Sequence, residues 1–307
     1  MEGLQVRLNP RSAARVRAGD GEGDSHALGE RRRPGEVKGG RFVARGAIAS
    51  NLLSTLRDLQ RRKARGRRGL APVEGIRLVE EALAAGLRVR GAVVSPAFAR
   101  TARGVELRAE LERRGIPVEA VAERTFTQLA DTDTPQGIIA VVEPRKWTAA
   151  DLALDRARGL LVIDGVQDPG NVGTLIRTAH ALGAGGTIVL RGTADINGPK
   201  TLRAAMGSAF RHPVVSMDDN AFIAWARKQD VTLWATAADG TPLERALNER
   251  DRAGPVAVIV GNEGAGIRPA LNAIAARRVA IPLAPGAESL NVGVAAGILL
   301  YGVLRAD

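Results

Sequence analysis

The chain has 307 residues, of which 45% are hydrophobic and 25% charged, as expected for a globular protein of about two domains. It contains no cysteine, which excludes disulfides, thiolate catalysis and cysteine-bound zinc, and three isolated histidines give no reason to expect a metal site. No apolar run reaches the roughly 18 to 20 residues of a membrane helix, and the N-terminus lacks the apolar core of a signal peptide, so we expect a cytoplasmic protein.

The net charge of +11 lies almost entirely in the first fifth of the chain. Residues 1–68 carry 17 lysines and arginines against 7 acids, whereas the rest carries 27 against 26. Such a basic segment is typical of a nucleic-acid partner, although a tail that only aids solubility is the alternative.

Residues 1–45 are rich in Gly, Arg and Glu without periodicity, which predicts a disordered basic tail. A helical pattern follows from Asn51 and ends in a basic cluster before the first strand. The pattern then predicts helices over 73–85 and 105–114 and strands over 89–94, 116–121 and 136–142, a small α/β domain at 46–145. The candidate nucleic-acid-binding residues of the basic cluster are Arg61, Arg62, Lys63, Arg65, Arg67 and Arg68.

Strands and helices alternate more regularly from about residue 159 onward. This alternation predicts a mostly parallel sheet covered by helices on both faces, in a second domain at 155–307. The expected strands are 160–163, 187–190, 213–216, 231–236, 256–260 and 278–281, and the expected helices are 171–182, 199–209, 219–229, 268–275 and 290–305.

The first polar loop of this domain runs as Asp164-Gly-Val-Gln-Asp-Pro-Gly-Asn-Val-Gly-Thr-Leu-Ile-Arg177. Asn171 follows Pro169-Gly170 at the expected start of a helix, where its side chain would cap the first turn. Helical spacing places Arg177 on the polar arc with Asn171, directed at the mouth of the sheet rather than into the core. A capping asparagine and a solvated arginine are the plainer interpretation. The loop lacks the Gly-Lys-Ser/Thr of a phosphate-binding P-loop.

Two further loops, rich in glycine and proline, begin where later strands end. In Val260-Gly-Asn-Glu-Gly-Ala-Gly-Ile267, Glu263 can hold the loop by accepting backbone N–H groups or attract a cationic ligand. In Ile281-Pro-Leu-Ala-Pro-Gly-Ala-Glu-Ser-Leu-Asn-Val292, Ser289 and Asn291 stand at the entrance of the last helix, where both are ordinary caps. Because loops at the carboxyl ends of parallel strands build the binding crevice, three such loops predict an enzyme pocket.

The last predicted helix, residues 290–305, is apolar around its whole circumference from Val292 to Leu304. A helix of this kind must be buried against something large. We expect a second subunit, since the last helix of a chain rarely lies at the centre of its own domain.

Asn171 with Arg177 six residues later, Gly261-Asn-Glu-Gly-Ala-Gly266 and Ile281-Pro…Ser289-Leu-Asn-Val292 together resemble the three motifs of the SpoU family. Members of this family are RNA ribose 2′-O-methyltransferases of the SPOUT superfamily. The resemblance covers residues from about 50 to 307, since Val73–Glu80 and Thr134–Gly137 look like the family's small substrate-binding domain. It implies a parallel-sheet methyltransferase domain with a C-terminal trefoil knot, preceded by a small α/β domain, and a homodimer.

The resemblance also implies S-adenosylmethionine as the cofactor, bound in the knot by residues that correspond to Gly261, Ile281 and Leu290. A ribose 2′-hydroxyl is a poor nucleophile, so that the site must orient it and help to remove its proton. The implied catalytic residues are Arg177, Asn171, Glu263, Ser289 and Asn291. Arg177 is given the base role in the family, but a guanidinium is always protonated, and a phosphate clamp that orients the hydroxyl is physically easier.

The two-domain layout with a basic N-terminal helix resembles the ribosomal-RNA branch of the family, which makes ribosomal RNA the expected substrate. A tRNA methyltransferase, an antibiotic-resistance rRNA methyltransferase and a non-catalytic RNA-binding protein on the same scaffold are the alternatives. A Rossmann-type oxidoreductase is disfavoured because no Gly-x-Gly-x-x-Gly opens the first strand–helix turn.

Overall fold

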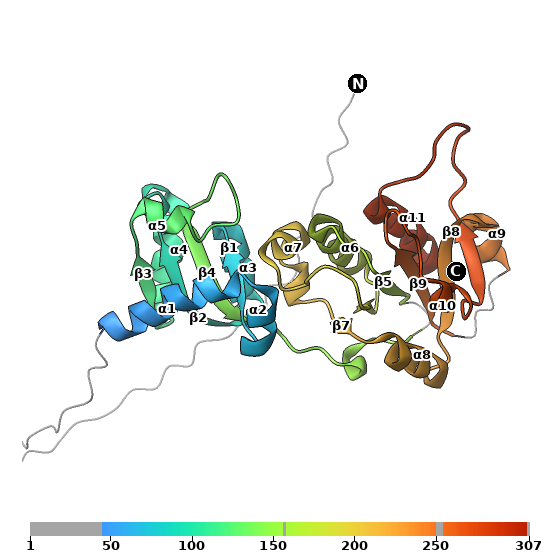
Figure 1. Ribbon diagram of the computed structural model, residues 1–307, viewed down its shortest axis with the longest axis horizontal. Helices are drawn as coiled ribbons and strands as arrows, with labels where there is room; N and C mark the ends of the chain where they lie inside the picture. Colours follow the sequence, from blue (N-terminus) through green and yellow to red (C-terminus); the bar gives the residue numbers. More distant parts are fainter. Residues whose placement is uncertain (1–44, 156–157, 250–253, 306–307) are drawn as a thin grey trace, which may run out of the picture. The chain divides into compact units, whose positions relative to one another are not determined.

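The computed structural model describes residues 45–155, 158–249 and 254–305, with side chains from residue 51 onward (Figure 1). These residues form a four-stranded sheet between residues 71 and 143 and a six-stranded sheet between residues 160 and 280. The predicted tail, residues 1–45, lies outside the described residues except for its last position. No helix in the described part of the chain is long and apolar enough to cross a membrane.

The first sheet has the strand order β1-β4-β2-β3. Strand β4 runs antiparallel to β1 and β2, while β3 runs parallel to β2. The elements in chain order are α1 (Arg45–Leu59), α2 (Arg62–Arg68), β1 (Ala71–Glu74), α3 (Ile76–Ala84), β2 (Arg88–Val94), η1 (Phe98–Arg100), α4 (Ala102–Arg113), β3 (Val118–Ala120), α5 (Glu123–Thr127) and β4 (Ile138–Glu143).

The helix predicted from residue 73 begins three positions later, at Ile76. Ala71–Glu74 instead pair with β4 as a short edge strand, and Gly75, with a φ of 101°, turns the chain into the helix. A four-residue strand that contains a proline carries too little alternation to be predicted. Helix α3 buries one apolar face, formed by Ile76, Leu78, Val79, Ala82 and Leu83.

The second sheet is parallel throughout, with the strand order β10-β8-β9-β5-β6-β7. Its strands are β5 (Leu160–Asp164), β6 (Gly186–Val189), β7 (Val214–Ser216), β8 (Thr232–Pro242), β9 (Val256–Gly261) and β10 (Arg277–Ala280). The helices and turns around it are η2 (Ala149–Asp151), α6 (Pro169–Leu182), α7 (Pro199–Ala205), η3 (Ser208–Phe210), α8 (Asp219–Lys228), α9 (Leu243–Asn248), α10 (Pro269–Asn272) and α11 (Val292–Arg305).

Helices cover both faces of the parallel sheet, as predicted. Leu161 and Ile163 of β5 join a core with α6 and α11, whereas Leu160 and Val162 join a core with α8 and α10 on the other face. The central strands β5 and β9 pair so that Asp164 lies beside Gly261 at their carboxyl ends. The first two polar loops therefore leave the sheet side by side. The trefoil knot stays a prediction from the resemblance.

Helix α11 differs from the prediction for the last helix. Leu299, Leu300 and Val303 are buried in the core of their own domain, at 0 to 2% exposure. The opposite face leaves Val294, Ile298 and Tyr301 exposed by 52%, 40% and 58%. The expectation that the whole helix needs a second subunit was wrong for the first face, because α11 packs on α6 and β9 within the domain (Figure 1).

Candidate active site

Side chains from the three predicted loops form one hydrogen-bonded chain. Asn171 Nδ2 donates to Glu263 Oε1 at 2.8 Å, and Asn291 Nδ2 donates to Asn171 Oδ1 at 3.0 Å. The first contact arises because β5 and β9 are neighbours, and the second because α11 packs against α6. We call Glu263, Asn171 and Asn291 the amide chain.

The amide chain has a fixed direction. The backbone N–H of Gly293 donates to Asn291 Oδ1 at 2.9 Å, which turns the NH₂ group of Asn291 toward Asn171. Asn171 must then present its oxygen to Asn291 and its own NH₂ group to the carboxylate oxygen of Glu263, which accepts the hydrogen bond. The donor at one end and the acceptor at the other therefore determine both amide orientations.

Helix α6 begins two residues earlier than predicted, and its cap is Asp168 rather than Asn171. Asp168 Oδ1 accepts from the backbone N–H of Asn171 at 2.8 Å, and Pro169 occupies the first turn. This bond, helped by the Lys200 ammonium 3.2 Å from Oδ2, lowers the pKa of Asp168. Because Asp168 is the cap, the side chain of Asn171 is available to the amide chain.

The loop after β9 is a tight turn closed on itself. Asn262 and Gly266 exchange backbone hydrogen bonds of 3.1 and 2.9 Å, and Asn262 Nδ2 donates to the Gly165 carbonyl at 3.0 Å. A Cβ atom on Gly261 would lie 2.3 Å from the carbonyl carbon of Gly266. Position 261 therefore requires glycine, because the backbone of Gly266 and Ile267 in the same turn passes close to it.

Arg268 anchors this loop at its far end. Its backbone N–H and Nε donate to Asp164 at 2.8 and 2.6 Å, and its terminal nitrogens form a bidentate pair with Asp219 at 2.6 and 2.8 Å. The bond to Asp164 raises the pKa of Arg268 above its ordinary value. This cluster was not predicted from the sequence. Asp164 could have indicated it, because an acid that follows an apolar strand is buried and then needs a partner.

The third loop lines a cavity of about 200 Å³. The lining residues are Thr236, Ala237, Ala238, Val279, Ile281, Leu283, Glu288, Ser289, Leu290, Ala295 and Leu299. Ile281, Ser289 and Leu290 are thus brought together as predicted, whereas Gly261 is not among the lining residues. Leu283 and Leu290 are each 39% exposed, and such apolar walls with few polar groups suit a flat aromatic ring.

Arg177 and Ser289 lie outside the amide chain. Both side chains are exposed, and neither makes a hydrogen bond or ion pair with any residue that the structure describes. They are therefore free to contact a ligand. No group of three or more His, Asp or Glu side chains within the described ranges could hold a metal ion.

Two glycines let the first half of α11 pack closely on α6. A Cβ atom on Gly293 would lie 2.9 Å from Thr174 Cγ2, and one on Gly297 would lie 3.5 Å from Thr178 Cγ2. Residues with a side chain at 293 would push the start of α11 away from α6. The close packing therefore supports the contact between Asn291 and Asn171.

The basic cluster does not form a uniform positive surface. Arg61, Arg67 and Arg68 all pair with Asp58. Hydrogen bonds from Arg68 and Arg61 lower the pKa of Asp58 to about 2. The carboxylate therefore stays ionised and cancels part of the cluster's charge.

Arg65 of the same cluster is buried. Its Nε donates to Asp195 at 2.7 Å, and its Nη1 donates to the carbonyls of Leu59 and Gln60 at 2.7 and 3.0 Å. These contacts hold α2 to the loop before α7. We therefore leave Arg65 out of the candidate RNA surface, which keeps the exposed Arg61, Arg62, Lys63, Arg67 and Arg68.

A parallel α/β domain with a largely apolar cavity beside the carboxyl end of β10 has the architecture of enzymes that bind a ligand at the ends of their strands. The SpoU rRNA Methylase family model matches residues 159–301, and the MRM3-like substrate binding domain model matches residues 51–140. The chain belongs to the SpoU rRNA methylase family.

Curated relatives resemble most of the chain. The 23S rRNA (guanosine(2553)-2′-O)-methyltransferase RlmP of Bacillus subtilis is 37% identical over 246 residues, which cover 80% of this chain and 92% of the relative. The 23S rRNA (guanosine-2′-O-)-methyltransferase RlmB of Pectobacterium atrosepticum is 32% identical, over 64% of this chain and 82% of the relative.

Solved structures resemble the fold over similar lengths. The SpoU methyltransferase AviRb from Streptomyces viridochromogenes, in complex with AdoMet, matches with a TM-score of 0.72 and 28% identity over 82% of this chain and 96% of its own. An AdoMet-bound rRNA methyltransferase from Sinorhizobium meliloti matches with a TM-score of 0.71 and 32% identity, over 82% and 94% of the two chains.

Proposed function

We propose that this chain transfers a methyl group from S-adenosylmethionine to a ribose 2′-hydroxyl of ribosomal RNA. The observation that carries the proposal is the amide chain, which joins one side chain from each motif loop. Its last member, Asn291, directly follows two residues of the cavity wall, Ser289 and Leu290. The relatives RlmP and RlmB are named for this reaction on 23S rRNA.

The cavity at the third loop suits the cofactor. Ile281, Leu283 and Leu290 would cover the faces of the adenine ring, and backbone groups within β8 and after β10 would read its edges. Gly261 belongs to this site indirectly, since it shapes the turn that closes the carboxyl end of β9. When bound, the cofactor supplies a sulfonium methyl group for displacement.

Arg177 acts on the RNA side of the reaction. Its guanidinium stays protonated, so it orients the 2′-hydroxyl and binds the adjacent phosphate rather than acting as the base. Its exposure and lack of protein partners among the described residues support this role.

The remaining site residues position the ribose. Asn171 and Asn291 fix the geometry through the amide chain, and Glu263 holds the turn after β9 to the start of α6. Ser289, exposed at the cavity, is the hydroxyl available to the substrate.

The first domain, residues 46–145, binds the RNA, and the second, residues 155–307, carries out methyl transfer. The exposed members of the basic cluster contact phosphates, and each contact adds about 0.7 to 0.9 to the salt slope of log affinity. The face of α11 formed by Val294, Ile298 and Tyr301 is the contact surface of a homodimer, because these large side chains are exposed to solvent in the single chain and would be buried between two copies.

Methylation of purified RNA fractions tests the proposed substrate. Unmodified 23S rRNA, 16S rRNA and bulk tRNA are each incubated with the protein and methyl-labelled S-adenosylmethionine. Label in 23S or 16S rRNA alone is expected. Label in tRNA alone would overturn the ribosomal assignment, and cofactor binding without label in any RNA would overturn catalysis.

A further inference from the structure

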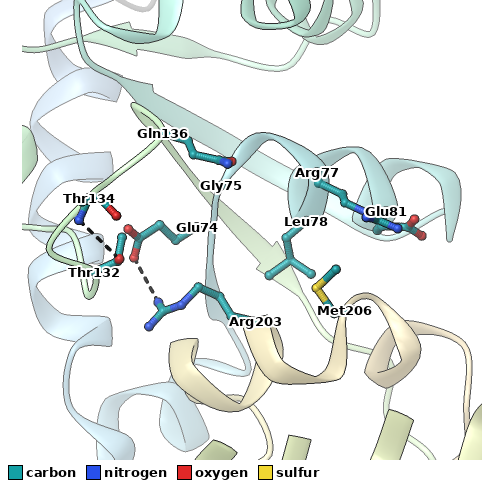
Figure 2. A pocket seen from close by; sticks show the side chains of 10 residues that line it. All are labelled: Glu74, Gly75, Arg77, Leu78, Glu81, Thr132, Thr134, Gln136, Arg203 and Met206. Atoms are coloured by element: carbon teal, nitrogen blue, oxygen red, sulfur yellow. Dashed lines mark hydrogen bonds and ion pairs between the residues drawn. The ribbon is translucent and has the colours of Figure 1, made fainter. Parts of the chain in front are cut away.

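A cavity of about 280 Å³ is formed by the start of α3, the loop before β4 and the end of α7 (Figure 2). Figure 2 shows the side chain of Met206 reaching from the end of α7 toward Leu78 of α3. Methionine sulfur makes favourable contacts with aromatic rings, and an apolar wall of this kind suits the face of a flat ring. The cavity therefore has one side on which a planar group can lie.

Arg77 gives this cavity an unbalanced positive charge. Glu81 on the same wall pairs with Arg211 at 2.6 Å. Glu74 on the opposite wall pairs with Arg203 at 3.2 Å. Arg77 is exposed and makes no ion pair with any residue that the structure describes. Because the other charges of the lining are paired, the free guanidinium favours a ligand with a phosphate.

Gln136 offers a hydrogen-bond donor to the same cavity. Its Oε1 accepts from the backbone N–H of Ile76 at 2.9 Å, which fixes the orientation of the amide group. The NH₂ group makes no hydrogen bond within the described part of the chain, and the side chain is exposed. Free donors beside an apolar wall suit a ligand that joins acceptors to a flat ring, and a nucleotide is such a ligand.

Met206 is held in a left-handed backbone conformation, with a φ of 50°. Bulky side chains rarely adopt this conformation, whereas glycine adopts it freely. The side chain of Met206 is nevertheless 39% exposed, so burial in the core does not account for a methionine at this position. A residue kept in a strained conformation indicates a functional role, and contact with a ligand in the cavity is such a role.

The cavity lies beside the turn of α6 that carries Arg177. A Cβ atom on Gly173 of α6 would lie 2.5 Å from Ala204 Cβ of α7. Further along α6, His180 Nδ1 lies 3.1 Å from Ser208 Oγ of η3. Arg177 stands between these two contacts on α6, and the end of α7 that borders the cavity stands between them on the facing side. A nucleotide held by Arg177 would therefore have its neighbour close to the cavity.

We propose that this cavity receives an unpaired nucleotide adjacent to the methylated one, with its base against Leu78 and Met206 and its phosphate at Arg77. The Gln136 NH₂ group donates to an acceptor on the edge of the base. Proteins commonly recognise RNA through such splayed nucleotides, whose bases lie against side chains. This subsite rests on the proposed function for its RNA and for the place of Arg177, but its binding test needs no methyl transfer.

The affinity for unmodified 23S rRNA, measured by filter binding at several salt concentrations, tests the phosphate contact. Arg77→Gln should weaken binding several-fold and lower the salt slope of log affinity by about 0.7, the value of one contact to a single strand. Arg124→Gln is the matched control and should bind as the wild type does. Arg124 is exposed on α5, which packs on the face of the first sheet opposite to α3.

Met206→Gly tests the base contact. Because glycine adopts the left-handed conformation freely, the melting temperature should change little. The affinity for the rRNA should fall about fivefold, within the range of one contact between sulfur and an aromatic ring. Wild-type affinity in both Met206→Gly and Arg77→Gln would overturn the inference.

Photocrosslinking locates the bound nucleotide. Since the chain contains no cysteine, Met206→Cys carries a single thiol for a short photocrosslinker. We expect a crosslink to 23S rRNA beside the nucleotide that the wild type methylates, and none there with Arg124→Cys. A crosslink to distant nucleotides or only to protein would overturn the inference. Weaker binding by both variants, in a protein that binds this RNA but does not methylate it, would support the cavity and contradict the proposed function.

Discussion

Reversing the direction of the amide chain tests whether it organises the active site. Asn291→Asp keeps the oxygen that accepts from the Gly293 N–H, so the start of α11 stays capped. It removes the NH₂ group that donates to Asn171 Oδ1 at 3.0 Å, so two acceptors face each other. If Asn171 flips to donate to the new carboxylate, its oxygen then faces the Glu263 carboxylate instead. One contact is mismatched in either arrangement.

The magnitude follows from the exposure of these groups. An unsatisfied buried group costs about 1 to 3 kcal/mol, and the low end applies because Glu263 and Asn291 are exposed and Asn171 is half-buried. A loss of about 1.4 kcal/mol corresponds to about tenfold in rate. Glu263→Gln alone should cost little, since its amide oxygen still accepts from Asn171. In the double variant both side-chain contacts are matched again, because Asn171 donates to the new carboxylate at position 291 and accepts from the new amide at position 263.

Single-turnover methyl transfer, measured for the wild type, both single variants and the double variant, gives the coupling between positions 263 and 291. The expected result is about a tenfold loss in Asn291→Asp and recovery of most of that loss in the double variant, with cofactor affinity unchanged throughout. A double variant no faster than Asn291→Asp would refute the idea that the direction of the amide chain matters.

Three further predictions concern separate parts of the molecule. Arg177→Ala should lower the single-turnover rate by about 10² or more, with the affinity for S-adenosylmethionine unchanged by calorimetry; near-normal rates at saturating RNA would contradict the clamp role. Combined Ile298→Glu and Tyr301→Glu should give a folded monomer by light scattering, whereas Leu299→Glu, 2% exposed, should unfold the domain; a stable dimer of the first variant would place the interface elsewhere. Burial lowers the pKa of His212 to about 4 from 6.5, so the unfolded chain binds its proton at higher pH than the folded chain. The free energy of unfolding should therefore be unaffected by His212 above about pH 6.5 and should fall by about 2 to 3 kcal/mol between there and about pH 4.5. Urea unfolding should show a weaker pH dependence in His212→Gln than in the wild type. The same pH dependence in both proteins would refute the prediction.

The parallel sheet and the residues of the amide chain could be predicted because their signals are local. Strand ends, turns and polar residues follow one another in sequence, and parallel pairing then brings the loops to one edge. The capping of α6 was assigned to Asn171, which follows Pro169-Gly170, although Asp168 is an equally good cap by residue type. Only the backbone geometry selects Asp168, which leaves Asn171 for Glu263 and Asn291.

The two faces of α11 could not be read from the sequence. Apolar periodicity reports that a surface is covered, but not whether the chain itself or another molecule covers it. Arg65 shows the same limit for charge, since its neighbours in the basic cluster are exposed while it is buried against Asp195, 130 positions away.

The chemical position of the transferred methyl group shows whether this protein methylates ribose. Unmodified ribosomal RNA is methylated with labelled S-adenosylmethionine, hydrolysed with alkali and separated by chromatography. Alkali cleaves RNA through the free 2′-hydroxyl, so a 2′-O-methyl group leaves an uncleaved dinucleotide. We expect label in one alkali-resistant dinucleotide, and no such label with Arg177→Ala. Label released in mononucleotides would place the methyl group on a base and would overturn ribose methylation.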